Sequence, residues 1–226
     1  MKRRLVALNC YKYVLFDLDG TLTDPMVGIT KSVQYGLSKC GVIEDNLEKL
    51  TPFIGPPLLD SFMEYYSFSE AKAKQAIEYY REYFSVTGKF ENKVYPGVSD
   101  MLSLLKANNC KLIIATSKPT VFSEDILKHF DLLGYFDMVV GSELDGSRVS
   151  KEDVIQYVLT LIGPYDKKEV IMVGDRKFDI LGAKSVGIDS IAVTYGYGSM
   201  EELYKCSPTF FADSIDELKQ LLCSDF

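Results

Sequence analysis

The sequence predicts an α/β fold, in which a doubly wound parallel sheet carries an inserted small all-α cap domain. Short apolar runs without polar alternation indicate strands that are buried on both faces. Amphipathic helical segments separate most of these runs, and this alternation favours parallel strands with helices on both faces of the sheet. A long helical block follows the first strand directly. We expect this block to form a small lobe of its own.

The elements of the sheet domain are predicted from apolar runs and helical spacing, taken in order along the chain. The expected strands are 12–16, 111–116, 136–141, 169–174, 189–195 and, from a fainter pattern, 209–212. The expected helices are 98–108, 122–133, 151–162, 178–186, 199–205 and 214–223. Each of these runs is four to eight residues long and lacks polar alternation, as expected for strands buried on both faces.

The stretch from residue 24 to about residue 94 shows helical patterns and no strand run. Ser69 is the expected N-cap of its last helix, which Gly88 should end. The predicted division is a core domain of residues 1–23 and 95–226 and a cap domain of residues 24–94.

Composition limits the possible partners and the cellular compartment. With 226 residues, 47% of them hydrophobic, the chain can bury a substantial core. Its net charge of −7, without a long basic cluster, argues against nucleic acid as a main partner. Five dispersed cysteines favour reduced thiols, and the apolar stretch 5–8 is too short for a signal peptide or a membrane span. We therefore expect a cytoplasmic protein without membrane association, and the oligomeric state stays open.

Polar side chains follow the predicted strands, at the sheet edge where parallel α/β proteins bind ligands. Asp17 and Asp19 follow the first strand, and residues two apart in a strand share a face. Two adjacent carboxylates need a cation or a division of roles. Gly20 permits a sharp turn beside them. The later strand ends contribute Thr116-Ser117-Lys118, Lys151, Asp175 and Asp179. Together these residue types suit an oxygen-ligated Mg²⁺ and a phosphate.

These motifs resemble those of the haloacid dehalogenase superfamily of phosphohydrolases, in the branch with a helical cap after the first strand. The matching pieces are Asp17-x-Asp19-Gly20-Thr21, the hydroxyl of Thr116, Lys151 and Gly174-Asp175-x-x-x-Asp179, in the family's order. The resemblance spans residues 12–213. It implies a phosphatase that takes a small-molecule phosphate ester and uses Mg²⁺.

The resemblance also implies roles for individual residues. Asp17 would attack phosphorus to form an aspartyl-phosphate, and Asp19 would protonate the leaving alcohol and later activate water. Thr116, with backbone N–H groups near it and near Gly20, would hold phosphate oxygens, and Lys151 would balance charge. The implied metal residues are Asp17, Asp19 through its main-chain carbonyl, Asp175 and, in the metal shell or orienting Lys151, Asp179. The implied substrate-binding residues are Gly20, Gly55, Pro56, Thr116, Ser117 and Lys151.

Local structure offers a second explanation for several of these residues. Asp179 stands in the first turn of a helix, where an acidic side chain is favourable regardless of function. Gly55 and Pro56 lie in a stiff turn that either reads the substrate or only connects two helices. His129 is expected to be structural. Tyr195-Gly196-Tyr197-Gly198 lacks the context of a dinucleotide fingerprint and is interpreted as a loop.

The motif also separates the reactions that this family hosts. An acid at position 19 favours phosphate esters, because it can protonate an alkoxide. The absence of histidine from residues 22–31 argues against a sugar-phosphate mutase, which stays an alternative together with a non-catalytic binding protein. The sequence as a whole is similar to phosphoglycolate phosphatases and to bacterial 5′-nucleotidases.

We expect the cap to open and close about hinges near Asp24-Pro25 and Lys93-Pro96.

Overall fold

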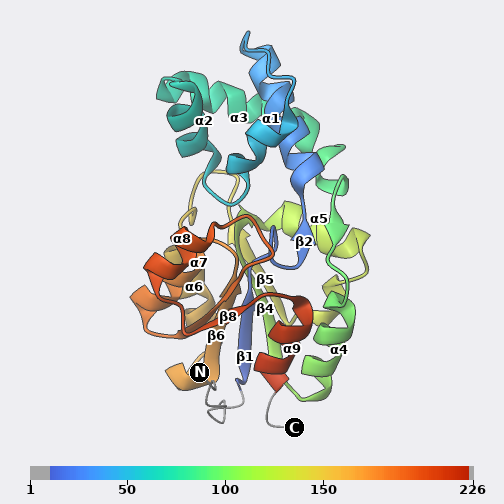
Figure 1. The fold of residues 1–226 in the computed structure, drawn as a ribbon, viewed down its shortest axis with the longest axis vertical. Helices are drawn as coiled ribbons and strands as arrows, with labels where there is room; N and C mark the ends of the chain where they lie inside the picture. Colours follow the sequence, from blue (N-terminus) through green and yellow to red (C-terminus); the bar gives the residue numbers. More distant parts are fainter. Residues whose placement is uncertain (1–10, 224–226) are drawn as a thin grey trace.

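The computed structural model describes residues 11–223 and confirms the predicted α/β class (Figure 1). Six parallel strands form one sheet in the order β5-β4-β1-β6-β7-β8. The strands are β1 (Tyr13–Phe16), β4 (Lys111–Pro119), β5 (Met138–Ser142), β6 (Val170–Gly174), β7 (Asp189–Val193) and β8 (Phe210–Ala212). The apolar stretch 5–8 and Cys10 lie outside the described residues.

Strand β1 lies at the centre of the sheet because its side chains are apolar on both faces. Val14, Leu15 and Phe16 are fully buried. The strand pairs with β4 on one side and with β6 on the other. From β1 the strand order runs outward in both directions, which makes its carboxyl end the switch point where such sheets bind ligands.

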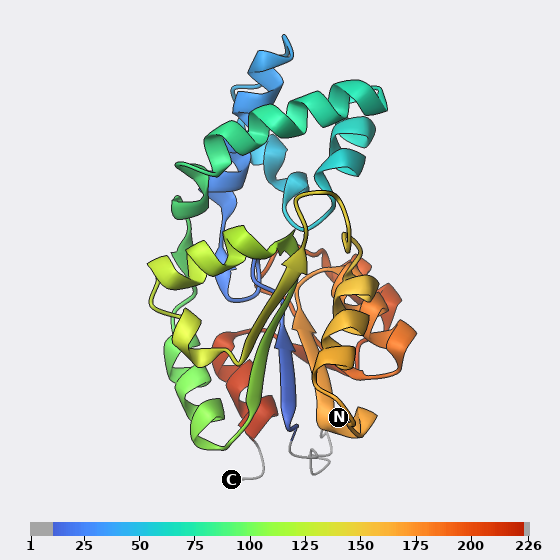
Figure 2. The same ribbon diagram turned by 180° about the vertical axis from the view of Figure 1, so that it is seen from behind.

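Helices cover both faces of the sheet, as the sequence predicts (Figure 2). Leu15 packs with residues of α6 and α7, whereas Val14 and Phe16 belong to the apolar cluster that includes α4, α5 and α9. This alternation follows from the period of two in a strand. The helices are α4 (Val98–Ala107), α5 (Thr120–His129), α6 (Lys151–Leu161), α7 (Lys177–Val186), α8 (Met200–Cys206) and α9 (Ile215–Cys223), with 3₁₀ turns η3 (Leu133–Tyr135) and η4 (Lys167–Glu169).

Several predicted boundaries differ from the observed ones at loops and caps. Strand β4 continues past residue 116 to Pro119, with a register shift between Ala115 and Pro119. Helix α5 begins at Thr120, directly after Pro119, and ends at His129 instead of residue 133. Asp131 adopts a left-handed conformation, with φ of 58°, which no helix can continue.

The predicted helical block is present and stands beyond the carboxyl ends of the strands (Figures 1 and 2). We call its helices the cap helices: α1 (Met26–Lys39), η1 (Leu47–Phe53), α2 (Leu58–Tyr66), α3 (Glu70–Phe84) and η2 (Gly88–Phe90). Ser69 caps α3 as predicted, because its hydroxyl accepts a hydrogen bond from the Lys72 N–H at 3.3 Å. The helix ends at Phe84, before Gly88, which instead begins η2.

A short antiparallel ribbon joins the cap helices to the sheet, where the sequence shows no strand run. Strand β2 (Thr23–Asp24) pairs with β3 (Lys93–Val94). Two residues per strand are too few to produce a detectable pattern of alternation. The chain therefore leaves the sheet and returns to it through two adjacent segments. No helix within residues 11–223 is long and apolar enough to cross a membrane.

Candidate active site

The polar residues predicted at the strand ends lie together and are buried. Asp17, Asp19, Thr116 and Lys151 have exposed fractions of 6%, 8%, 2% and 5%, and Asp175 is fully buried. Asp17 and Asp19 follow β1, Asp175 follows β6, Thr116 lies within β4, and Lys151 is the first residue of α6. Because burying charges is costly unless they are paired, the contacts among these groups determine what the site can do.

Lys151 lies between two carboxylates of this site. Ser150 caps α6 by accepting a hydrogen bond from the Asp153 N–H at 3.1 Å, which sets Lys151 in the first turn. The Lys151 Nζ lies 2.8 Å from Asp17 Oδ1 and 2.9 Å from Asp179 Oδ1, and it donates to the Ala115 carbonyl at 3.0 Å. Burial alone would lower the pKa of Lys151, but the two carboxylates outweigh it and raise the pKa. Lys151 therefore stays charged.

Asp17, Asp175 and Asp179 form a buried acidic cluster whose ligand oxygens all lie within 4.8 Å of one another. Asp175 Oδ2 accepts a hydrogen bond from the Tyr197 N–H at 2.8 Å. Burial, followed by the charges of Asp179 and Asp17, raises the pKa of Asp175 well above its ordinary value. Burial likewise raises the pKa of Asp179 to about 6. The cluster is short of positive charge.

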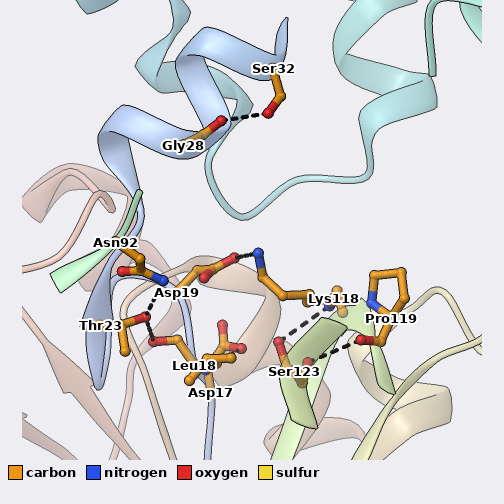
Figure 3. A network of polar contacts seen from close by, with 12 residues as sticks. Asp17, Leu18, Asp19, Thr23, Gly28, Ser32, Asn92, Lys118, Pro119 and Ser123 are labelled. Carbon is orange, nitrogen blue, oxygen red and sulfur yellow. Dashed lines mark hydrogen bonds and ion pairs between the residues drawn. The ribbon is translucent and has the colours of Figure 1, made fainter. Parts of the chain in front are cut away.

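Asp19 has a different partner from the other three carboxylates. Its Oδ2 lies 2.7 Å from Lys118 Nζ, and Figure 3 shows Lys118 extending across the site to reach it. The same ammonium group lies 4.3 Å from the centre of the Phe84 ring, at the end of α3. Burial raises the pKa of Asp19, and the Lys118 charge opposes this shift. The sequence places Lys118 after a strand but gives no sign of this pairing.

Charge balance tests whether a divalent cation fits this site. Within residues 11–223, the buried carboxylates of Asp17, Asp19, Asp175 and Asp179 face two ammonium groups, those of Lys118 and Lys151. The excess of two negative charges equals the charge of one Mg²⁺, and carboxylate oxygens are the ligands that Mg²⁺ prefers. In addition, the buried Asp19 Oδ1 has no hydrogen bond within the described chain. The residues present fit a divalent cation.

Three glycines let the backbone approach Asp175. Gly20 has φ of +78°, and a Cβ there, or at Gly196 or Gly198, would overlap atoms of Asp175. Residues 195–198 are confirmed as a loop, but nothing in the sequence indicates that this loop wraps the Asp175 carboxylate. The Gly20 N–H donates to the Thr23 carbonyl at 2.7 Å, so it is already occupied within the turn.

One cavity of about 820 Å³ opens between the sheet edge and the cap helices. Asp17, Asp19, Thr116 and Ser117 line its floor, and Gly55 and Pro56, between η1 and α2, line its cap side. Arg176, which follows Asp175, donates to the Ile54 carbonyl and forms an ion pair with Glu202 at 3.0 Å. The structure therefore brings the predicted cap turn to the same cavity as the acid pair. His129 lies away from it, 4.7 Å from the Phe90 ring.

The family follows from comparison with known proteins. Residues 14–193 match the model of the haloacid dehalogenase-like hydrolases. The chain belongs to that family. The predicted resemblance and the prediction of an enzyme are therefore confirmed at this level.

Similar proteins of this family carry several names. A 5′-nucleotidase of Pseudomonas aeruginosa is 46% identical over 94% of this chain and 96% of its own. A phosphoglycolate phosphatase of the same organism is 28% identical over 95% of this chain and 80% of its own length. The tyrosine-protein kinase PtkA of Mycobacterium tuberculosis is 36% identical over 92% of this chain and 72% of its own length. A crystal structure of a predicted phosphatase from Clostridium acetobutylicum is 51% identical over 96% of this chain and 100% of its own, with a TM-score of 0.92.

Proposed function

We propose that this haloacid dehalogenase-like hydrolase is a Mg²⁺-dependent phosphomonoesterase that acts through an aspartyl-phosphate on Asp17. The observation that carries the proposal is that two buried acids have different partners. Asp17 belongs to the acidic cluster and pairs with Lys151, whereas Asp19 pairs with Lys118. Different environments divide the roles of two carboxylates. Relatives named as phosphatases, among others, support the reaction class.

Each residue has a defined part in this reaction. Asp17 attacks phosphorus while Lys151 neutralises charge on the carboxylate and on the incoming phosphate. Asp19 donates a proton to the leaving alcohol oxygen and then takes one from the water that hydrolyses the acyl-phosphate. Thr116 and Ser117, on the cavity floor, hold phosphate oxygens. Asp17, the Asp19 carbonyl and Asp175 would hold a Mg²⁺ ion, which would supply positive charge that eases attack on a phosphate dianion.

Asp179 is assigned the role of orienting Lys151. Its Oδ1 contacts the Lys151 ammonium group, and its Oδ2 accepts from the Arg176 N–H at 3.1 Å. The second contact belongs to the start of α7, so helix capping and orientation of Lys151 are served by the same carboxylate.

We also propose that residues 24–94 act as a movable cap domain over a core of residues 1–23 and 95–226. The connecting segments β2 and β3 are the hinges in this proposal, and Lys93 is exposed. Opening would admit substrate and closing would exclude water during attack by Asp17.

The main alternative is transfer of the phosphoryl group to an acceptor other than water, which a mutase or a kinase would require. Both would need an acceptor hydroxyl in place of water at the aspartyl-phosphate. The absence of histidine from residues 22–31 argues against a mutase, and water is the acceptor in our proposal.

Release of inorganic phosphate from a panel of phosphate monoesters tests the proposal. Glycolate phosphate, nucleoside monophosphates and sugar phosphates belong on the panel, each with Mg²⁺ and with EDTA. We expect Mg²⁺-dependent turnover of at least one ester by the wild type and none by Asp17→Asn. Turnover by Asp17→Asn at the wild-type rate, or no turnover of any ester, would contradict it.

A further inference from the structure

The part of the cavity that lies away from Asp17 and Asp19 has its own composition. We call it the outer pocket; it is lined by residues of α2, α3 and the loop 142–150. If Asp17 attacks phosphorus, as proposed above, the alcohol portion of the substrate extends into this outer pocket. Its chemistry therefore indicates which alcohols fit.

The cations of the outer pocket are already paired with carboxylates. The Lys74 Nζ lies 2.5 Å from Glu70 Oε1, and the Arg81 Nη1 lies 3.0 Å from Glu78 Oε1. The third cation, Arg148, forms an ion pair with Glu143, donates to the Gly141 carbonyl at 2.9 Å and lies over the Tyr157 ring. Each of these three cations therefore already has a carboxylate partner within the pocket.

Acidic side chains exceed the cations in this pocket. Beyond the paired carboxylates, Asp60, Asp145 and Asp153 line it without an ion pair in the described part of the chain. The outer pocket thus holds six carboxylates and three cations. The hydrogen bond from the Ser147 N–H lowers the pKa of Asp145, so this carboxylate stays charged. A cleft lined by an excess of one sign repels ligands of that sign.

The remaining walls are apolar and only partly buried. Leu59, Ile77, Phe122 and Leu144 all line the cavity, and Leu144 is 46% exposed. Apolar and aromatic walls with a few polar groups are typical of sites for small organic ligands. The whole cavity measures about 820 Å³, within the range of sites for drug-sized ligands, so a two-carbon phosphate ester would fill only a small part of it.

We infer that the outer pocket selects phosphate esters of uncharged, ring-bearing alcohols and rejects esters whose alcohol carries a second anionic group. A nucleoside 5′-monophosphate has this chemistry, with a single phosphate and an apolar ring face. Glycolate phosphate carries a carboxylate, and a bisphosphate carries a second phosphate. This inference rests on the proposed phosphomonoesterase activity.

Matched pairs of esters test the inference through kcat/KM with Mg²⁺. Ethyl phosphate and glycolate phosphate differ mainly by the carboxylate, and adenosine 5′-monophosphate and adenosine 3′,5′-bisphosphate differ by the second phosphate. We expect the uncharged alcohol to be favoured about tenfold in each pair, less at high salt, because salt screens the exposed carboxylates. Adenosine 5′-monophosphate should also exceed ethyl phosphate.

Neutralising the unpaired acids provides the matched variants. The double variant Asp60→Asn with Asp145→Asn should bring both kcat/KM ratios closer to one. Asp100 is an exposed acid on α4 outside the cavity, so Asp100→Asn should leave both ratios unchanged. The inference would be overturned if the anionic esters were turned over as fast or faster, or if ethyl phosphate matched adenosine 5′-monophosphate. It would also be overturned if the double variant left both kcat/KM ratios unchanged. In each of these cases the phosphomonoesterase proposal would still stand. No turnover of any ester would overturn both.

Discussion

Lys118 Nζ lies 2.7 Å from Asp19 Oδ2 and 4.3 Å from the centre of the Phe84 ring. One ammonium group therefore contacts both the proposed acid/base and a cap helix. This arrangement makes the environment of Asp19 depend on the position of α3. It also means that Lys118 acts on the reaction through Asp19, as a positioning residue.

Replacing Lys118 removes the positive partner of a buried carboxylate. Without the opposing charge, burial should raise the pKa of Asp19 further, so the limb of the pH–rate profile that reports on Asp19 should move to higher pH. For Lys118→Met we expect kcat to fall about a hundredfold at neutral pH. The measurement is kcat against pH, with Lys118→Arg as the variant that keeps the charge. An unshifted profile in Lys118→Met would show that the ion pair does not tune Asp19.

Mg²⁺ should stabilise the protein more at about pH 7.5 than at about pH 5. Burial, followed by the charges of Asp179 and Asp17, raises the pKa of the proposed ligand Asp175 well above 3.8. In the metal-free protein its contribution to stability is therefore greatest below pH 3.8 and is lost as pH rises through its raised pKa. Deprotonated carboxylates are needed to bind the ion. At an Mg²⁺ concentration of 100 times Kd the gain is about 2.7 kcal/mol. The measurement is the shift in Tm with Mg²⁺ at the two pH values.

Asp175→Asn is the matched variant for this measurement. It removes one carboxylate of the cluster while keeping the side-chain shape. We expect it to lose most of the Mg²⁺-dependent shift in Tm. An equal shift in Asp175→Asn and wild type would place the bound ion elsewhere.

Arg176 joins the segment after β6 to the cap turn through the Ile54 carbonyl. Gly55, with φ of +102°, packs against the Arg176 side chain. A hydrogen bond from a charged donor contributes about 1.5–3 kcal/mol, so Arg176→Ala should raise KM about tenfold for an ester with a large alcohol. The kcat for a small ester, which does not reach the cap turn, should change less. Equal effects on both esters would mean that Arg176 acts on the catalytic groups instead.

Gly196 leaves no room for a side chain beside Asp175. A Cβ at this position would overlap the Asp175 side chain and the Gly20 carbonyl. We expect Gly196→Ala to lower the free energy of unfolding by about 1–3 kcal/mol. Gly134→Ala is the control, because a Cβ there has open space around it. Denaturant unfolding of both variants measures the difference, and equal stability would contradict the packing argument.

The sequence predicted those features of the site that are set by local position. Asp17, Asp19 and Asp175 follow apolar strands, and parallel strands bring their carboxyl ends to one edge. Features set by distant contacts were not predictable. Nothing near Lys118 in the sequence points to Asp19, because the pairing depends on how β4 lies beside β1. The packing of Gly196 on Asp175 likewise joins two loops that are separate in the chain, and the β2–β3 ribbon is too short to leave a pattern.

Trapping a covalent phosphoryl-enzyme intermediate would show whether Asp17 is the nucleophile. In Asp19→Asn, 4-nitrophenyl phosphate should still phosphorylate Asp17, because its leaving group needs no proton, whereas hydrolysis should be slow without the base. Acid quenching followed by intact and peptide mass spectrometry would measure the adduct. We predict one phosphoryl group on the peptide that contains Asp17 in Asp19→Asn, and none when Asp17→Asn is added. A phosphorylated residue other than Asp17, or release of 4-nitrophenol without any adduct, would mean that Asp17 is not the nucleophile.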